Sequence, residues 1–281
     1  MTPFIGGLVL LAALLHAGWN AMAKSGGTPQ YSIASYRLVS AICCLPLLFW
    51  FPLPLAASWP MLLASMVIHT LYYVTLSKSY KSGDLSQVYP LFRGLAPVLV
   101  LLGAALLAGE YIGSGAMLGI GLVSVGLVSI TFAGGALGKI SSAALGWGLA
   151  TSVLIAAYTI ADGMGVRAAG NPFSYIIWLF ILEPIPIVSW LLLRDRAGWF
   201  GYIRKKPGKI CAGAFAAATA YAMVIYAMGV APMAMVSSLR ETSVIFAALI
   251  GTLLFREPFG RQRIIAAILV CCGVALIKIL D

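Results

Sequence analysis

The stretch RGLAPVLVLLGAALLAGEYIG (residues 93–113) decides the fold, because the chain repeats its pattern as RETSVIFAALIGTLLFREPFG (residues 240–260). The two stretches align without gaps at an offset of 147 residues, so that arginine meets arginine and Glu110 meets Glu257. Leucine and glycine matches are common in apolar sequences, whereas a matched arginine and glutamate in unbroken register are not. The chain is therefore predicted to contain two related halves.

Composition places both halves in a membrane. Hydrophobic residues make up 62% of the 281 residues and charged residues only 9%, whereas soluble domains carry about 25% charged residues. A soluble protein so poor in charge would expose large apolar patches. The predicted partners are therefore the lipid bilayer and a small-molecule substrate. The net charge of +10 lies mostly in short gaps between apolar runs, which favours a role in membrane topology over nucleic-acid binding.

The predicted fold class is an all-α integral membrane protein with ten transmembrane helices. A helix needs about 20 apolar residues to cross a bilayer. Ten such runs follow one another, separated by glycine, proline and charged residues: 4–23, 31–53, 60–80, 87–108, 112–132, 142–163, 173–193, 210–229, 232–254 and 261–280. The predicted location is the inner (plasma) membrane.

The repeat divides the ten helices into residues 1–134 and 140–281, with five helices each. Because five is an odd number, the second half enters the membrane with the opposite orientation. Such inverted repeats place a substrate cavity at the interface of the halves, near the membrane midplane, and support alternating access.

The positions of the lysines and arginines predict how the chain is oriented in the membrane. They gather on the side that also holds Lys24, Lys81 and Lys139, in the loops after the seventh and ninth runs: Arg194, Arg196, Arg204, Lys205, Lys206, Lys209, Arg256, Arg261 and Arg263. Lys/Arg-rich loops stay in the cytoplasm, which predicts that both termini lie outside.

The sequence gives little support for an enzymatic function. All five cysteines lie within apolar runs, without CxxC or Cys/His spacing, and the two histidines are far apart without an HExxH motif. Phosphate-binding motifs such as Walker A are also missing from the sequence. We therefore expect no metal, no cofactor and no catalytic residues.

Several motifs, in their order along the chain, resemble the drug/metabolite transporter superfamily, of the EamA type. They are His16-Ala-Gly-Trp-Asn20, Arg37, the stretch 82–90, Gly109-Glu110 and Arg256-Glu257. The resemblance implies metabolite export or exchange, with amino acids among the substrates. It also implies a cavity lined by helices one, three, four, six, eight and nine. Termini in this family usually face the cytoplasm, which conflicts with the orientation that the cations predict.

Arg93 and Arg240 are the leading candidates for the substrate site. Charged groups inside a membrane helix are costly and normally face a cavity or a partner. Tyr89 lies one turn before Arg93, and Ser237 and Glu241 flank Arg240. Two guanidinium groups at matching depths suit a carboxylate or phosphate. The alternative is structural, with each arginine tying helices together or pairing with a buried glutamate.

Two aromatic faces are further candidates for the cavity. Helical spacing places His16, Trp19 and Asn20 on one face of the first helix, and His69, Tyr72 and Tyr73 on one face of the third. These groups could stack on or hydrogen-bond a ligand. Interhelical hydrogen bonds or an interfacial aromatic belt are the alternative.

Three further charged residues are candidates for a proton site or an ion pair. Glu183 lies in the middle of the seventh run, followed by Pro184 and Pro186, and Arg37 occupies the corresponding place in the first half. A structural ion pair between Glu183 and an arginine is the favoured interpretation. Asp162 follows Tyr158 by four residues, and we expect it to cap the helix or to face water.

The fifth helix is rich in glycine, and Gly115 and Gly119 have the spacing of a close helix contact. This face is a candidate for a homodimer interface. The favoured function is a secondary transporter or exporter of an amino acid or another anionic or zwitterionic metabolite. The alternatives are a flippase for a lipid-linked substrate and an exporter of multiple drugs or organic cations, with a membrane-embedded enzyme less favoured.

Overall fold

The computed structural model describes residues 1–24, 28–82, 85–131, 141–255 and 261–279, and these ranges are mostly helical and contain no β-strand. Glu257 and the predicted boundaries at 134 and 140 lie outside the described residues. The first part of the chain forms α1 (Pro3–Lys24), α2 (Pro29–Cys44), the 3-10 helices η1 (Leu45–Phe49) and η2 (Ala56–Ser58), α3 (Trp59–Ser82), α4 (Leu85–Ala108) and α5 (Ser114–Thr131).

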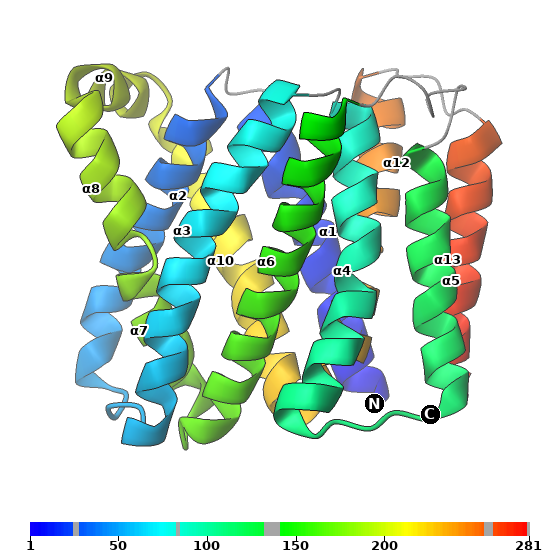
Figure 1. The fold of residues 1–281 in the computed structure, drawn as a ribbon. Coiled ribbons are helices and arrows are strands. Elements are labelled where there is room, and N and C mark those ends of the chain that lie inside the picture. The colour runs from blue at the N-terminus through cyan, green and yellow to red at the C-terminus, as the bar shows by residue number, and fades with distance from the viewer. Residues whose placement is uncertain (25–27, 83–84, 132–140, 256–260, 280–281) are drawn as a thin grey trace.

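The second part forms α6 (Ser142–Ala168), α7 (Pro172–Leu182), α8 (Ile185–Arg194), α9 (Arg196–Lys205), α10 (Pro207–Val230), α11 (Met233–Arg240), α12 (Ser243–Phe255) and α13 (Arg261–Ile279). The helices run roughly alongside one another as a bundle, with both ends of the chain at the edge opposite α9 (Figure 1). The start of α1 and the end of α13 therefore lie at the same end of the bundle, and the side of the membrane that they face stays a prediction.

The predicted membrane class is confirmed. Within the described ranges, eight segments are long and apolar enough to cross a membrane, and each coincides with a predicted run. The two remaining runs, the fifth and the tenth, correspond to shorter apolar helices at Ser114–Ile130 and Ile264–Ile279. A total of ten crossings stays a prediction.

Two predicted helices are broken near their middles. The seventh run divides into α7 and α8 around Glu183 and Pro184, where proline ends the regular hydrogen bonding. The ninth run divides into α11 and α12. At this break, the amides of Glu241 and Thr242 donate to the carbonyls three residues before, each at 3.1 Å. Broken helices at membrane depth are tolerated where they are covered by protein.

The basic stretch after α8 contains a short helix, α9, that the apolar runs did not predict. Asp195 accepts a hydrogen bond from the Gly198 amide at 3.1 Å and so caps the start of α9. The fully buried Trp199 donates its indole N–H to Ser35 Oγ on α2 at 2.9 Å. One tryptophan therefore anchors this basic helix to the bundle.

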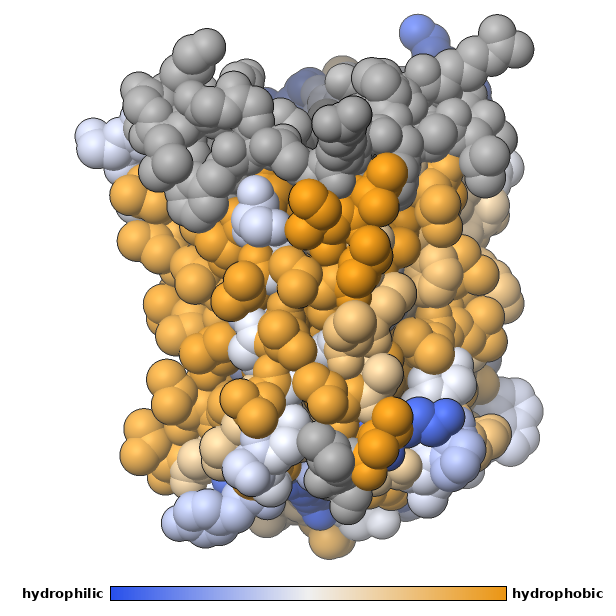
Figure 2. Space-filling model, turned by 90° about the vertical axis from the view of Figure 1, so that its right-hand side faces the viewer, coloured by the Kyte–Doolittle hydropathy of each residue, from blue (hydrophilic) through white to orange (hydrophobic). Residues whose placement is uncertain are grey.

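The helices α5 and α13 pack closely through glycine. A Cβ atom on Gly119 would lie 2.6 Å from the Gly273 carbonyl oxygen, which only the absence of a side chain permits. Figure 2 shows the apolar band on this side of the molecule, where Leu118 and Val125 are exposed. Gly119 therefore serves a contact within the chain, and a homodimer through α5 stays a prediction.

Candidate functional site

A cluster of three charged side chains lies at the break between α11 and α12. Arg93 on α4 places Nε 2.6 Å from Glu241 Oε2, and Arg240 Nε lies 3.9 Å from Glu241 Oε1. Arg93 also donates through Nη2 to Ser243 Oγ at 3.2 Å. The two arginines are each 3% exposed and Glu241 is 0% exposed. Two guanidiniums and one carboxylate leave one net positive charge, closed to water in this conformation.

Arg240 keeps unused hydrogen-bonding capacity. Its Nε and Nη2 atoms are buried and have no hydrogen-bond partner among the described residues. The hydroxyl of Ser237, one helical turn earlier, is also buried without such a partner. Buried donors without partners are costly, and a guanidinium matches a carboxylate in shape and charge. The cluster can therefore accept an anion at Arg240.

Aromatic rings cover both arginines. The Tyr89 ring centroid lies 6.0 Å from Arg93 Cζ, and the Tyr158 centroid lies 6.0 Å from Arg240 Cζ. His69 stacks on Tyr158 at 4.2 Å, and Tyr72 meets the same ring edge-on at 5.6 Å. The structure therefore brings His69, Tyr72 and Tyr89 to the arginine cluster, together with Tyr158, which was not among the predicted site residues.

The three residues of the predicted face of α1 lie next to one another. His16 lies within electrostatic range of Arg93, Arg240 and Arg37, so it is near the cluster. Trp19 packs edge-on against His16 at 5.1 Å and, on its other side, against Tyr36 of an apolar group at 6.4 Å. Asn20 donates its side-chain amide to the His16 carbonyl at 2.8 Å. Of these three residues, His16 is placed best to meet a ligand.

Arg37, Glu183 and Tyr73 form a second charged group. Arg37 Nε lies 3.4 Å from Glu183 Oε2, and the Tyr73 hydroxyl donates to Glu183 Oε1 at 2.5 Å. The carboxylate lies at the break between α7 and α8, so the break is covered by charged and hydroxyl partners from α2 and α3. These contacts use both oxygens of Glu183.

Asp162 was expected to cap α6 or to face water, and this is wrong because the residue is 0% exposed. Its Oδ1 accepts a hydrogen bond from the Tyr175 hydroxyl at 3.0 Å, and its Oδ2 accepts one from the Tyr221 hydroxyl. The contribution of Tyr221 on α10 had no signal in the sequence. The spacing of Tyr158 and Asp162, four residues apart on α6, was the only local clue.

An ion pair closes the end of the bundle nearest the termini. Arg167 Nη2 lies 2.5 Å from Glu110 Oε1 and donates to the Ala231 carbonyl at 2.8 Å. Glu110 also accepts a hydrogen bond from the Met233 amide, at 2.9 Å to Oε2. The glutamate that marks the first repeat thus joins the end of α4 to the start of α11.

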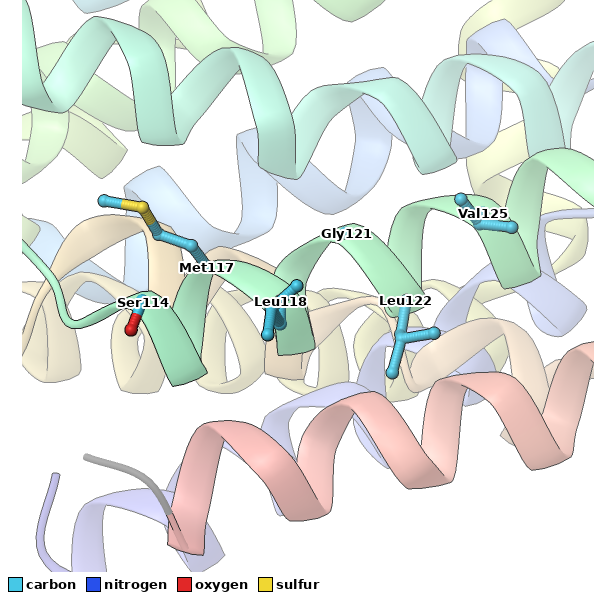
Figure 3. A pocket seen from close by; sticks show the side chains of 6 residues that line it. All are labelled: Ser114, Met117, Leu118, Gly121, Leu122 and Val125. Atoms are coloured by element: carbon cyan, nitrogen blue, oxygen red, sulfur yellow. The ribbon is translucent and has the colours of Figure 1, made fainter.

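A groove on the outside of α5 has no such chemistry. It measures about 590 Å³ and is lined by Ser114, Met117, Leu118, Gly121, Leu122 and Val125, and Figure 3 shows its side chains along one helix. Ser114 supplies its only side-chain polar group. This surface suits lipid tails better than a charged metabolite.

Long apolar helices around a buried charged centre define a multi-pass membrane protein. A family model described as EamA-like transporter family matches the chain twice, over residues 4–132 and 142–279. The chain belongs to the EamA-like transporter family, within the drug/metabolite transporter superfamily. Members of this family are transporters rather than enzymes.

One solved protein crystal structure is similar over 99% of this chain and 96% of its own, with a TM-score of 0.76 and 14% identity. At this identity the likeness shows the fold alone. A search among curated proteins found no match.

Proposed function

We propose that this protein is a secondary transporter of a small anionic or zwitterionic metabolite, of the amino-acid type, across the inner membrane. The substrate binds at Arg93, Arg240 and Glu241 and crosses by alternating access of the halves 1–134 and 140–281. The double match of the family model, over 4–132 and 142–279, supports the division into halves.

The observation that carries this proposal is that Arg240 Nε and Nη2 have no hydrogen-bond partner among the described residues, inside a cluster with one net positive charge. A substrate carboxylate would satisfy the free donors of Arg240 and neutralise the cluster. An ammonium group on the same substrate would find Glu241 beside it. A zwitterion thus matches both signs of charge, whereas an organic cation would meet net repulsion.

The cluster also joins the two proposed halves. Arg93 belongs to α4 in the first half, whereas Glu241 and Ser243 belong to the second half. A rocking motion of one half against the other would pull Arg93 away from Glu241 and open the arginines to water. A substrate that bridges these side chains would favour the closed state, which is the behaviour that alternating access requires.

The test begins with the purified protein in detergent and a thermal-shift screen of amino acids, organic phosphates, nucleosides and organic cations. We expect anionic or zwitterionic compounds to raise the melting temperature. Arg240→Leu keeps apolar bulk and removes the charge, so it should weaken that binding at least tenfold, or about 1.4 kcal/mol.

The matched control is Arg194→Leu at the exposed end of α8, which should leave binding unchanged. Stabilisation by organic cations alone, or equal binding by the Arg240→Leu variant, would contradict the proposal. If the Arg240→Leu variant is lost as unfolded protein, Arg240 is a structural tie. Arg240→Lys then tests the same site with its charge retained.

A further inference from the structure

A second buried acidic group, Asp162, has no place in the proposed substrate site. Its carboxylate is 0% exposed and is held by the hydroxyls of Tyr175 and Tyr221. Within the described part of the chain, neither lysine nor arginine forms an ion pair with it. Glu183 and Glu241, by contrast, each have an arginine partner.

The surroundings of Asp162 accommodate either protonation state. Hydroxyl groups both donate and accept, and their hydrogens rotate to suit the neighbour. Tyr175 and Tyr221 can therefore donate to a carboxylate, and one of them can accept from a carboxylic acid. A charged carboxylate without a cation is costly at membrane depth, and binding a proton removes that cost.

A polar connection leads from Asp162 to α3. The Ser65 side chain lies beside Asp162, and its hydroxyl lies 3.1 Å from His69 Nδ1. His69 is 3% exposed, and its ring meets the Tyr221 ring edge-on at 5.7 Å. Ser65 thus connects two titratable groups on different helices.

The titratable and polar groups around Asp162 come from five helices. They are His69 and Ser65 on α3, Tyr158 on α6, Tyr175 on α7, Tyr221 on α10 and, beyond the tyrosine rings, Arg240 on α11. The helix α3 belongs to the first proposed half and the others to the second. A rocking motion would therefore change the surroundings of Asp162.

We propose that Asp162 is a proton-binding site, with Ser65 and His69 as its relay, and that its protonation promotes anion binding at Arg240. An Oδ–H bond forms with a proton taken from water on one side of the membrane and breaks on release to the other side. No electrons are transferred. The coupling to transport rests on the proposed function, whereas the proton site itself does not.

The charge of Asp162 determines whether its protonation strengthens or weakens anion binding at Arg240. An ionised Asp162 repels a substrate carboxylate that approaches Arg240, and a protonated Asp162 does not. Two unit charges about 10 Å apart, at an effective dielectric constant of about 20, change a binding constant by about tenfold. By linkage, the anion in turn favours the proton to the same degree, so proton and substrate move together.

The proton site is tested by infrared titration of carboxyl groups in the purified protein. We expect a protonated-carboxyl band in the wild type that Asp162→Asn removes. Asp195→Asn is the matched control, because Asp195 is exposed and asparagine also caps helices well. The control should retain the band. A band that survives in the Asp162→Asn variant would overturn the proposal.

Tyr221→Phe provides a second variant that keeps the carboxyl group. It removes one donor to the carboxylate, so the band should titrate at higher pH. If Asp162→Asn does not fold, the Tyr221→Phe variant tests whether Asp162 is the proton-binding site. An unchanged titration of the carboxyl band in Tyr221→Phe would then contradict the proposal.

The coupling is tested with L-glutamate as the probe. Wild-type affinity should rise about tenfold as Asp162 becomes protonated, and Asp162→Asn should bind L-glutamate tightly at every pH. A pH dependence that persists in the Asp162→Asn variant would overturn the coupling. If the wild type does not bind L-glutamate at any pH, the amino-acid substrate fails for this probe, and the infrared titration still judges the proton site.

Discussion

Glu241→Gln is the change that probes the arginine cluster most directly. Glu241 is wholly buried, 2.6 Å from Arg93 Nε and 3.9 Å from Arg240 Nε. Glutamine keeps the size of the side chain and removes its charge. The two guanidiniums would then lie buried together without a counter-charge.

The cost of this change can be estimated from the geometry. Two unit charges at the 2.6 Å of the Arg93–Glu241 contact attract by about 6 kcal/mol at an effective dielectric constant of about 20. Removing one partner of a buried pair typically costs about 3–5 kcal/mol, because hydrogen bonds to the new side chain recover part of the loss. A change of this size should lower the melting temperature by roughly 10 °C.

Ligand binding should change in opposite directions for two probes. In the Glu241→Gln variant, pyruvate should bind at least about tenfold more tightly, since it meets two uncompensated cations, and it should restore much of the lost stability. L-Alanine should bind more weakly because its ammonium group loses Glu241. Thermal shift and radioligand binding measure both effects.

The matched control is Glu110→Gln, which breaks the ion pair with Arg167 at the end of the bundle. It should lower the melting temperature without changing the preference between pyruvate and alanine. An unchanged preference in the Glu241→Gln variant would refute the assignment of the cluster as the substrate site. An unchanged melting temperature would show that Glu241 is not the counter-charge of the arginines.

Three further predictions concern stability and location. Gly119→Leu would drive a side chain into the Gly273 carbonyl and should cost at least about 2 kcal/mol of unfolding free energy. The control, Gly121→Leu, has open space around it and should cost little. Denaturation in detergent compares the two variants, and equal losses of stability would contradict close packing of α5 against α13. Trp199→Ala should cost about 3–5 kcal/mol because Trp199 is fully buried, and the exposed Phe200→Ala is its control in the same assay. The protein should fractionate with the inner membrane and resist carbonate extraction, and its release into the soluble fraction would refute the membrane assignment.

Composition and the lengths of the apolar runs were enough to predict the membrane class and the segments that form it. They could not predict both of the helix breaks, because only one break has a local signal in the sequence. Pro184 and Pro186 indicate the break after α7, since proline interrupts helical hydrogen bonding. Residues 241 and 242 are glutamate and threonine, which carry no comparable local signal. That break coincides with the contact to Arg93, which is distant in sequence.

The site was predictable where charge stands out against an apolar background. Arg93, Arg240 and Glu241 were identified because each is costly in lipid, and the structure brings them together. Tyr175 and Tyr221 were missed because tyrosines are common near membrane interfaces, and only the packing of α7 and α10 against α6 reveals their shared partner. Spacing did predict that His16 and Trp19 share one face of α1, and their rings meet edge-on at 5.1 Å.

The break between α11 and α12 also places partial charges of the backbone at the site. The carbonyl end of α11 lies at Arg240 and the amide end of α12 begins at Ser243, so two helix dipoles meet there. Each helix end carries roughly half an elementary charge, negative at the carbonyl end and positive at the amide end. These partial charges do not titrate, and no side-chain substitution removes them. Even a chain stripped of Arg240 and Glu241 would keep this pair of opposite poles inside the membrane.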